Sequence, residues 1–341
     1  MGPQTETSTL GRLASLDELP DRFAEIKQRL GSVIIGQEAV IEHLLIATFC
    51  QGHALLIGVP GLAKTLLVRA LAASLDLSFS RIQFTPDLMP GDILGSEILQ
   101  TDAATGERSL RFIEGPIFAN IVLADELNRT PPKTQAALLE AMEERQVTVG
   151  GCSRRLDSPF LVMATQNPIE QEGAYPLPEA QLDRFLFTLT IGYPTEAEER
   201  RIAAAGDEPT SKVREFTPIF DGHSLNALRD LIGLVPVSEH VAAYAVRLVR
   251  ATRPDDPACP EPVRPLIEWG AGPRAGQALL LAARCLAVLT GDPTPTTKHV
   301  ARLAPAVLRG RVVLSHVAIA QGLDTDRVLD SVFLSVEHPG R

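Results

Sequence analysis

The sequence predicts an α/β fold in which a doubly wound, mostly parallel sheet is followed by a smaller domain of helices only. Short, uninterrupted apolar runs, typical of strands buried on both faces, alternate with helical patterns as far as about residue 193. Beyond a polar, proline-containing stretch, only helical patterns continue. The length of 341 residues, with 45% hydrophobic content, is sufficient for about two domains. We expect a disordered segment at 1–14, an α/β domain at 15–205, a linker at 206–220 and a helical lid domain at 221–341.

The elements of the α/β domain follow from these patterns. Buried strands are expected at 53–58, 119–124 and 160–165, a more alternating strand at 185–191, and a further candidate at 78–84. Helices are expected at 15–30, 36–50, 64–75 and 132–145. Ser15 with Glu18, and Thr195 with Glu198, have the spacing of capping boxes. Thr130 is a candidate N-cap for the helix at 132–145.

The second domain is expected to contain helices only. Their predicted ranges are 224–232, 238–252, 274–290, 297–309 and 325–336. Gly291 lies where a helix C-cap belongs, because glycine adopts the left-handed conformation without a steric penalty. Pro305 is expected to kink or split its helix, because proline cannot donate the backbone hydrogen bond.

Composition and charge exclude several classes of function. A net charge of −10 and a pI near 5.3 argue against non-specific binding to nucleic acids or membrane surfaces. The N-terminus has no signal-peptide pattern, and the most apolar window, 278–289, is too short to span a bilayer. We therefore expect a soluble, cytoplasmic protein without membrane insertion. The widely spaced cysteines form no metal-binding or redox pattern and are read as ordinary thiols: Cys50, Cys152, Cys259 and Cys285.

Residues 58–65 form the most informative motif of the chain. They read Gly-Val-Pro-Gly-Leu-Ala-Lys-Thr, after the apolar run 54–57 and before the helical run 66–75. A buried strand, a glycine-rich turn and a helix N-terminus in this order cradle polyphosphate with backbone N–H groups. Lys64 would reach the outer phosphates, and the Thr65 hydroxyl would hold Mg²⁺. One position is unusual, because Ala63 stands where glycine commonly precedes the lysine.

Two carboxylates follow a second buried strand. The run 121–124 is apolar, and Asp125 and Glu126 emerge at its carboxyl end, where open α/β sheets bind ligands. Asp125 is the candidate ligand for Mg²⁺, and Glu126 is the candidate general base for an attacking water. The alternative is that both are solvated acids ending a strand. The phosphate-binding motif upstream favours the first interpretation.

Three further residues are candidates for the same chemistry. Asn167 follows the strand at 160–165 and could contact the γ-phosphate or the water; alternatively it belongs to an Asn-Pro turn. Arg184 could form a structural ion pair with Asp183 or Glu179, or project across a subunit interface as an arginine finger. Arg274 opens a helix against the helix dipole, which suits a residue with an anionic partner such as phosphate; the alternative is a simple exposed arginine.

These motifs, in this order, resemble those of the AAA+ ATPases, and more narrowly those of the MoxR family in the helix-2-insert clade. The resemblance covers about residues 17–330, and Ala before the motif lysine is usual in MoxR-like proteins. The motifs that carry it are residues 58–65, 124–132 (Ala-Asp-Glu-Leu-Asn-Arg-Thr-Pro-Pro), 164–168 (Ala-Thr-Gln-Asn-Pro), 182–185 (Leu-Asp-Arg-Phe) and 272–275 (Gly-Pro-Arg-Ala).

The resemblance implies a P-loop NTPase fold and a role for each motif. Lys64 and Thr65 would belong to Walker A, Asp125 and Glu126 to Walker B, Asn167 to sensor 1, Arg184 to the arginine finger and Arg274 to sensor 2. The segment 34–37 would lie near the adenine. The implied catalytic residues are Lys64, Glu126, Asn167 and Arg184; the implied metal ligands are Thr65 and Asp125. The implied nucleotide-binding residues are Ile35, Gly36, Gly58, Pro60, Gly61, Leu62, Ala63, Lys64, Thr65, Leu66 and Arg274.

Two hairpins are expected to serve the client or the central pore of a ring. The stretch 91–115 matches the helix-2 insert, with strands at 96–100 and 109–112 around a polar turn. A second candidate pairs 146–149 across a Gly150-Gly151 turn. Both are alternatively ordinary surface hairpins. Their charges are balanced, so they do not favour nucleic acid as a partner.

The function implied by the resemblance is that of an ATP-hydrolysing remodelling chaperone. It would use ATP and Mg²⁺, release ADP, and assemble as a ring, expected to be hexameric. Arg274 is expected to serve the same protomer's nucleotide and Arg184 the neighbour's. MoxR-like proteins typically work with von Willebrand factor A domain partners in maturing client proteins, often by metal or cofactor insertion. The alternatives are a chelatase- or helicase-type motor of the same clade and a nucleotide-gated scaffold without turnover.

Overall fold

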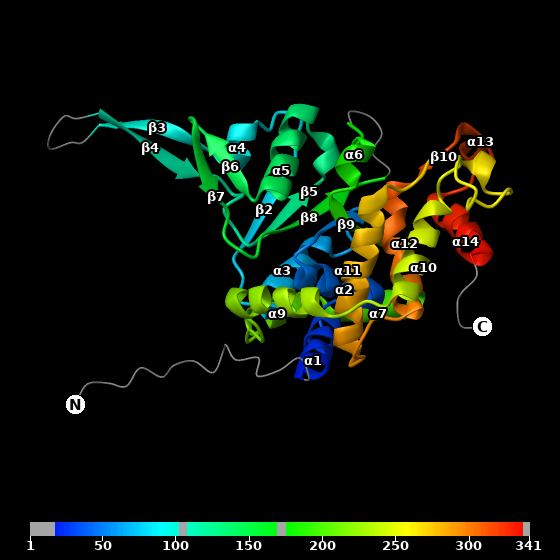
Figure 1. The fold of residues 1–341 in the computed structure, drawn as a ribbon. Coiled ribbons are helices and arrows are strands. Elements are labelled where there is room, and N and C mark those ends of the chain that lie inside the picture. Colours follow the sequence, from blue (N-terminus) through cyan, green and yellow to red (C-terminus); the bar gives the residue numbers. More distant parts are fainter. Residues whose placement is uncertain (1–17, 102–107, 169–174, 337–341) are drawn as a thin grey trace.

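The computed structural model describes residues 18–101, 108–168 and 175–336 (Figure 1). The expected disordered segment at 1–14, the capping residue Ser15 and the turn of the first hairpin lie outside these residues. Within them, the predicted fold class is confirmed: a parallel sheet with helices on both faces is followed by a helical domain.

Five parallel strands form the central sheet. In the order β2-β5-β8-β1-β9 they are β2 (Phe79–Gln83), β5 (Ile121–Asp125), β8 (Leu161–Gln166), β1 (His53–Ile57) and β9 (Phe185–Thr190). The three middle strands are apolar and almost wholly buried, as the continuous apolar runs predicted. All five carboxyl ends therefore meet at one edge of the sheet, and all five amino ends meet at the other.

Two helices precede the first strand of the sheet, and the others follow strands. They are α1 (Leu19–Gly31), α2 (Glu38–Cys50), α3 (Lys64–Ser74), α4 (Pro90–Leu94), α5 (Pro132–Glu144), α6 (Glu179–Leu182) and α7 (Glu196–Ala205). The Thr195–Glu198 capping box at the start of α7 is confirmed. The N-cap of α5 is Pro131 and not Thr130. The buried Thr130 lies one residue before the cap, and Pro132 fills the first turn, where proline costs no hydrogen bond.

The lid is mainly helical. Its helices are α9 (Gly222–Leu234), α10 (Glu239–Arg250), α11 (Pro273–Thr290), α12 (Thr297–Leu308), α13 (His316–Ala320) and α14 (Thr325–Ser335). The left-handed cap at Gly291 is confirmed. Pro305 does not split α12, whose well-buried residues on either side of the proline hold the helix in place.

Two expectations for this half of the chain need correction. The lid is not all-helical, because β10 (Ile267–Trp269) pairs antiparallel with β11 (Val313–Leu314). Strands of two or three residues are too short to leave a periodic pattern in the sequence. In addition, the stretch expected as a linker contains α8 (Glu208–Arg214), which packs against α3.

The lid packs directly on the α/β domain. Helices α11 and α12 lie beside α2 and β9 (Figure 1), and their buried side chains share one hydrophobic cluster with those of α1, α2 and α3. A second cluster covers the other face of the sheet and includes Leu138, Leu139 and Met142 of α5. The two clusters fix the sheet between α5 on one face and the lid on the other.

Both predicted hairpins are present. β3 (Gly95–Thr101) pairs with β4 (Arg108–Glu114), and β6 (Gln146–Val149) pairs with β7 (Cys152–Arg155). The first hairpin projects well beyond the body of the molecule (Figure 1). Its base rests on the second hairpin, where the Arg154 guanidinium lies 3.9 Å from the centre of the Phe112 ring.

None of the described helices is by itself long and apolar enough to cross a membrane. Only α9 and α10 taken as a pair would pass such a test, and they meet at a bend of 98°.

Candidate nucleotide-binding site

The predicted phosphate loop joins the carboxyl end of β1 to the first residue of α3. The Gly58 N–H donates to the Gln166 carbonyl at 3.1 Å, which fixes the start of the loop to β8. Gly61 has a φ of 88°, and a Cβ added there would meet no atom within 4 Å, so the loop is open on this side. Ala63 adopts the left-handed conformation, with φ 54°. An L-residue in that conformation costs about 1–2 kcal/mol, which explains why glycine is common at this position and shows that the loop accepts alanine.

Lys64 lies inside the loop. Its Nζ donates to the Gly58 carbonyl at 2.5 Å. Burial lowers the pKa of Lys64, and the nearby carboxylates of Asp125 and Glu126 oppose this shift. The ammonium group is therefore held at the centre of the loop, close to the two acidic residues.

A cavity of about 420 Å³ brings most of the predicted residues together. It is bounded by loop residues 60–66 and by the carboxyl ends of neighbouring strands, which contribute Arg81, Asp125, Glu126 and Asn167. Asn167 is buried at the end of β8. Three separate sequence motifs, the phosphate loop, the Asp125–Glu126 pair and Asn167, thus meet at one edge of the parallel sheet, as their positions after strands predicted.

Asp125 and Glu126 are held by side chains that the sequence analysis missed. The Thr165 hydroxyl donates to Asp125 Oδ1 at 2.7 Å, and the Arg81 Nη2 donates to Asp125 Oδ2 at 2.6 Å. Glu126 Oε2 accepts from Gln83 Nε2 at 2.8 Å and from Arg129 Nη1 at 2.9 Å. The sequence signal for Arg81 and Gln83 was that polar residues alternate at positions 81 and 83 of β2. This alternation indicates a role in the site only once β2 is known to pair with β5.

The donor set fits a magnesium ion. The buried Asp125 carboxylate and the Thr65 hydroxyl offer hard oxygen ligands. The described residues contain no group of three or more His, Cys, Asp or Glu side chains able to hold a metal. Mg²⁺ at nucleotide sites typically needs only one or two such protein ligands, because substrate phosphates and water supply the rest. The Arg81 guanidinium would compete with a bound metal for Asp125 Oδ2.

A second, largely apolar cavity adjoins the loop. It has a volume of about 480 Å³ and shares residues 60–63 and Leu66 with the first. Ile35, from the segment expected near the adenine, lines it together with residues of α7 and α8. Gly36, the next residue, does not line this cavity; it has φ 78°, and a Cβ there would come within 2.6 Å of the Glu198 carboxyl group. The stretch expected as a linker therefore provides part of the pocket wall.

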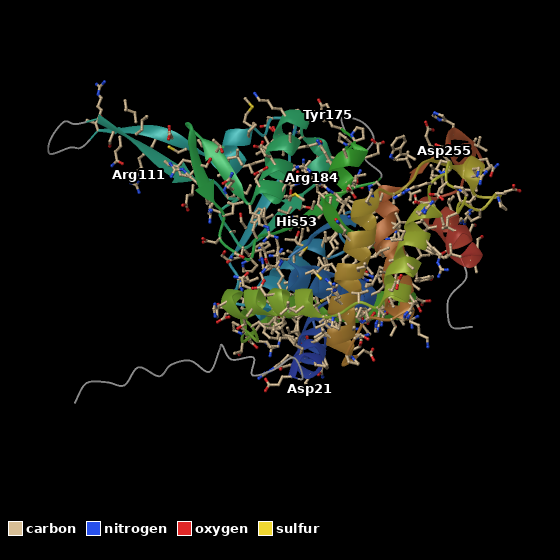
Figure 2. The ribbon with its side chains drawn as sticks, viewed as in Figure 1. Asp21, His53, Arg111, Tyr175, Arg184 and Asp255 are labelled. Atoms are coloured by element: carbon tan, nitrogen blue, oxygen red, sulfur yellow. The ribbon has the colours of Figure 1, made fainter. Side chains whose placement is uncertain are left out.

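Arg184 lies at the other edge of the sheet. It follows α6 and precedes β9, and it lies beside α5 (Figure 2). Because Phe185 pairs with His53 at the amino end of β1, Arg184 and the phosphate loop are separated by the length of that strand. A strand of five residues spans about 16 Å. The arginine therefore cannot reach the phosphates bound by its own loop.

Arg274 is also found at this second edge. Its Nη2 donates to Glu143 Oε1 at 3.2 Å, while Arg184 Nη2 donates to Glu143 Oε2 at 2.8 Å. Arg274 lines neither of the two cavities beside the phosphate loop. The ion pair with Asp183 or Glu179, one of the two alternatives for Arg184, does not form; Arg184 pairs with Glu143, and Asp183 pairs with Arg311 at 2.7 Å.

The comparisons with known proteins agree with this architecture. Residues 53–187 match the family described as ATPases associated with various cellular activities, and residues 262–332 match its lid domain. The chain is 41% identical to the chaperone MoxR1 of Mycobacterium tuberculosis, over 96% of this chain and 84% of the relative. It is 39% identical to an uncharacterized Bacillus subtilis protein, YeaC, over 96% and 98% of the two chains.

A solved structure extends the comparison to the fold. A protein from Cytophaga hutchinsonii that carries a provisional ATPase description superimposes with a TM-score of 0.80 and is 37% identical. The alignment covers 94% of this chain and 95% of that one. The relatives therefore share both the α/β domain and the lid.

Proposed function

This chain belongs to the MoxR family of AAA+ ATPases, and on that basis we propose that it binds and hydrolyses ATP to drive remodelling of client proteins. The observation that carries the proposal is the cavity in which the phosphate loop meets Asp125, Glu126 and Asn167. The adjoining apolar pocket supports a nucleotide rather than a simple phosphate, because a base needs an apolar surface beside the phosphate cradle.

Each side chain in this cavity has a proposed task. Lys64 and the backbone N–H groups of residues 61–65 hold the phosphates. Thr65 and Asp125 would hold Mg²⁺, and a bound Mg²⁺ would neutralise part of the phosphate charge. Glu126 accepts a proton from the attacking water, and Asn167 orients that water or the γ-phosphate. Gln83 and Arg129 fix the Glu126 carboxylate between turnovers.

We further propose that both Arg184 and Arg274 serve the nucleotide of a neighbouring subunit. The resemblance of the sequence motifs implied that Arg274 serves the same protomer as the phosphate loop. The ion pair of Arg274 with Glu143, which Arg184 shares, supports the opposite assignment. Positive charge that arrives from a second subunit would stabilise the transferred phosphoryl group, as arginine fingers do. A complete site then requires a ring, for which a hexamer remains the expected form.

Several finer expectations also stay proposals. These are a cytoplasmic location, a von Willebrand factor A domain partner, and maturation of a client by remodelling or by metal or cofactor insertion. The division at residues 206–220 is proposed as well, with α8 as part of the connection. The projecting β3–β4 hairpin, with Leu99 59% and Leu110 67% exposed near its tip, is the proposed client-contacting element.

The Glu126→Gln variant tests the catalytic assignment. It keeps the size and hydrogen bonds of the side chain and removes its basicity. We expect nucleotide binding within about twofold of wild type and a fall in kcat of about 100-fold or more. Fluorescent-nucleotide titration and phosphate release measure the two quantities. Turnover near the wild-type rate would remove Glu126 as the base.

A mixing experiment tests the shared site. The Lys64→Ala protomer lacks nucleotide binding but keeps its arginines, and the Arg184→Ala protomer has the reverse defect. Mixed rings should recover part of the activity that either variant lacks alone. No recovery, despite rings shown to be mixed by tagged co-purification, would contradict the assignment of Arg184 to the neighbour's site.

A further inference from the structure

Glu143, at the last turn of α5, bridges the two arginines that face away from the phosphate loop. One carboxylate oxygen accepts from Arg184 and the other from Arg274, at 2.8 Å and 3.2 Å. These three side chains come from parts of the chain more than 40 residues apart: α5, the α6–β9 junction and the first turn of α11. A single carboxylate therefore sets the distance between two like charges that would otherwise repel each other.

The bridge leaves both guanidinium groups accessible. The side chains of Arg184, Glu143 and Arg274 are 28%, 42% and 58% exposed. Arg184 uses Nη1 for the Leu139 carbonyl and Nη2 for Glu143, and Arg274 bonds to Glu143 through Nη2. An arginine carries five N–H donors, so donors remain for an anionic ligand. With two positive charges against one negative, the cluster keeps a surplus of positive charge.

The backbone of Arg184 is held as firmly as its side chain. The buried Arg311 of the lid donates from Nη2 to the carbonyls of Asp183 and Phe185, the two neighbours of Arg184, at 3.0 Å and 2.7 Å. The main chain is thus fixed by Arg311 and the guanidinium by Glu143 and Leu139. Such fixation from two sides is what a pre-organised binding group needs.

We propose that Glu143 is a positioning residue that holds Arg184 and Arg274 together as one two-pronged receptor for the γ-phosphate bound by the neighbouring subunit. The proposal rests on the proposed function, in which both arginines act across the subunit interface. Glu143 touches neither substrate nor metal. It acts by keeping the two guanidinium groups at a fixed spacing, so that both engage the same phosphoryl group without reorganisation.

The Glu143→Gln variant tests this role. It keeps the shape of the side chain and can accept a bond through one oxygen only. We expect kcat to fall by about tenfold, with the KM and the Kd for fluorescent ATP within about twofold of wild type, because the variant's own phosphate loop lies at the other edge of the sheet. Glu143→Asp keeps the negative charge on a shorter side chain, so its kcat should lie between those of wild type and Glu143→Gln. Glu144→Gln, an exposed neighbour on the same helix, is the matched control and should keep wild-type kinetics.

Mixed rings separate positioning from a general effect on folding. Glu143→Gln protomers should be complemented by Lys64→Ala protomers, which bring intact arginines to intact phosphate loops. Glu143→Gln protomers should not be complemented by Arg184→Ala protomers, because neither kind of protomer then supplies an intact pair of arginines to its neighbour. If Glu143→Gln only impaired folding, mixing it with Lys64→Ala protomers or with Arg184→Ala protomers would give the same result.

Several outcomes would overturn the inference. Wild-type kcat in Glu143→Gln would show that the bridge is dispensable, and a raised kcat would show that Glu143 competes with phosphate for the arginines. Loss of ATP binding in Glu143→Gln would place its effect in its own subunit. If Lys64→Ala and Arg184→Ala fail to complement each other, the shared site itself is wrong, whatever Glu143 does.

Discussion

We expect the buried His53 at the start of β1 to make the folded protein less stable in mild acid. Its Nδ1 accepts from the Val162 N–H at 2.9 Å, and its Nε2 lies 3.2 Å from the Met142 carbonyl, to which a neutral ring donates. Both bonds are made by the neutral tautomer with the proton on Nε2. Burial lowers the pKa of His53 to about 4, and the Met142 bond only partly opposes this shift.

The size of the effect follows from proton linkage. Between pH 6.5 and about 4 the unfolded chain binds a proton at this position that the folded chain does not, so the stability is present above pH 6.5 and is lost as the pH falls. The loss is about 1.4 kcal/mol per pH unit, which gives about 2 kcal/mol at pH 5.

A non-titrating replacement isolates this contribution. Glutamine can accept from one neighbour and donate to the other, so we compare urea unfolding of wild type and His53→Gln at pH 7.5 and pH 5.0. Other groups titrate equally in both proteins and cancel. The wild type should lose about 2 kcal/mol more than the variant over this interval. An equal loss in both proteins, or a His53 ring that titrates near pH 6.5 by NMR, would refute the reasoning.

Two further changes probe the nucleotide side of the molecule. Replacing Arg81 by Gln removes a cation from Asp125 Oδ2. Since Arg81 is 45% exposed, this ion pair is worth about 1 kcal/mol, so Mn²⁺ should bind the complex of the variant with ADP about fivefold more tightly, as measured by EPR. Weaker Mn²⁺ binding would mean that Arg81 supports the metal site. The Gly58→Ala change adds a Cβ only 2.9 Å from the Ile191 carbonyl oxygen, so the phosphate loop must shift. Calorimetry should therefore show an ATP affinity reduced about tenfold. An unchanged ATP affinity would show that the loop tolerates the displacement.

The sequence was most informative where a functional group lies within one short segment. Lys64 and Thr65 follow a strand within a single turn, and Asp125 and Glu126 end another, so local patterns were enough to predict both. Because parallel strands share one carboxyl edge, their meeting could also be predicted. The five strands of the central sheet and the two hairpins were recognisable for the same reason, since each is a local pattern of alternation or burial.

Residues that depend on register or on domain packing could not be predicted in this way. Arg81 acquires its partner only through the pairing of β2 with β5. Glu143 looks like one of several acids near the end of a helix until α11 and the α6–β9 junction are placed beside it. The position of Arg274 depends on how the lid packs against α2 and β9, which no local pattern describes.

The hydrogen bonds that Arg311 makes to the backbone on either side of Arg184 have a mechanical consequence. Besides the carbonyls that flank Arg184, Arg311 bonds to the Leu186 and Val307 carbonyls, and Arg309 bonds to the Thr188 carbonyl. Together with the shared hydrophobic cluster, the bonds to Leu186 and Thr188 join the lid and the sheet into one rigid unit, with the phosphate loop at one end of the strands and Arg184 at the other. If the chain forms the proposed ring and hydrolyses ATP there, we expect each hydrolysis event to move these rigid units at the contacts between subunits, so that force passes from one subunit to the next.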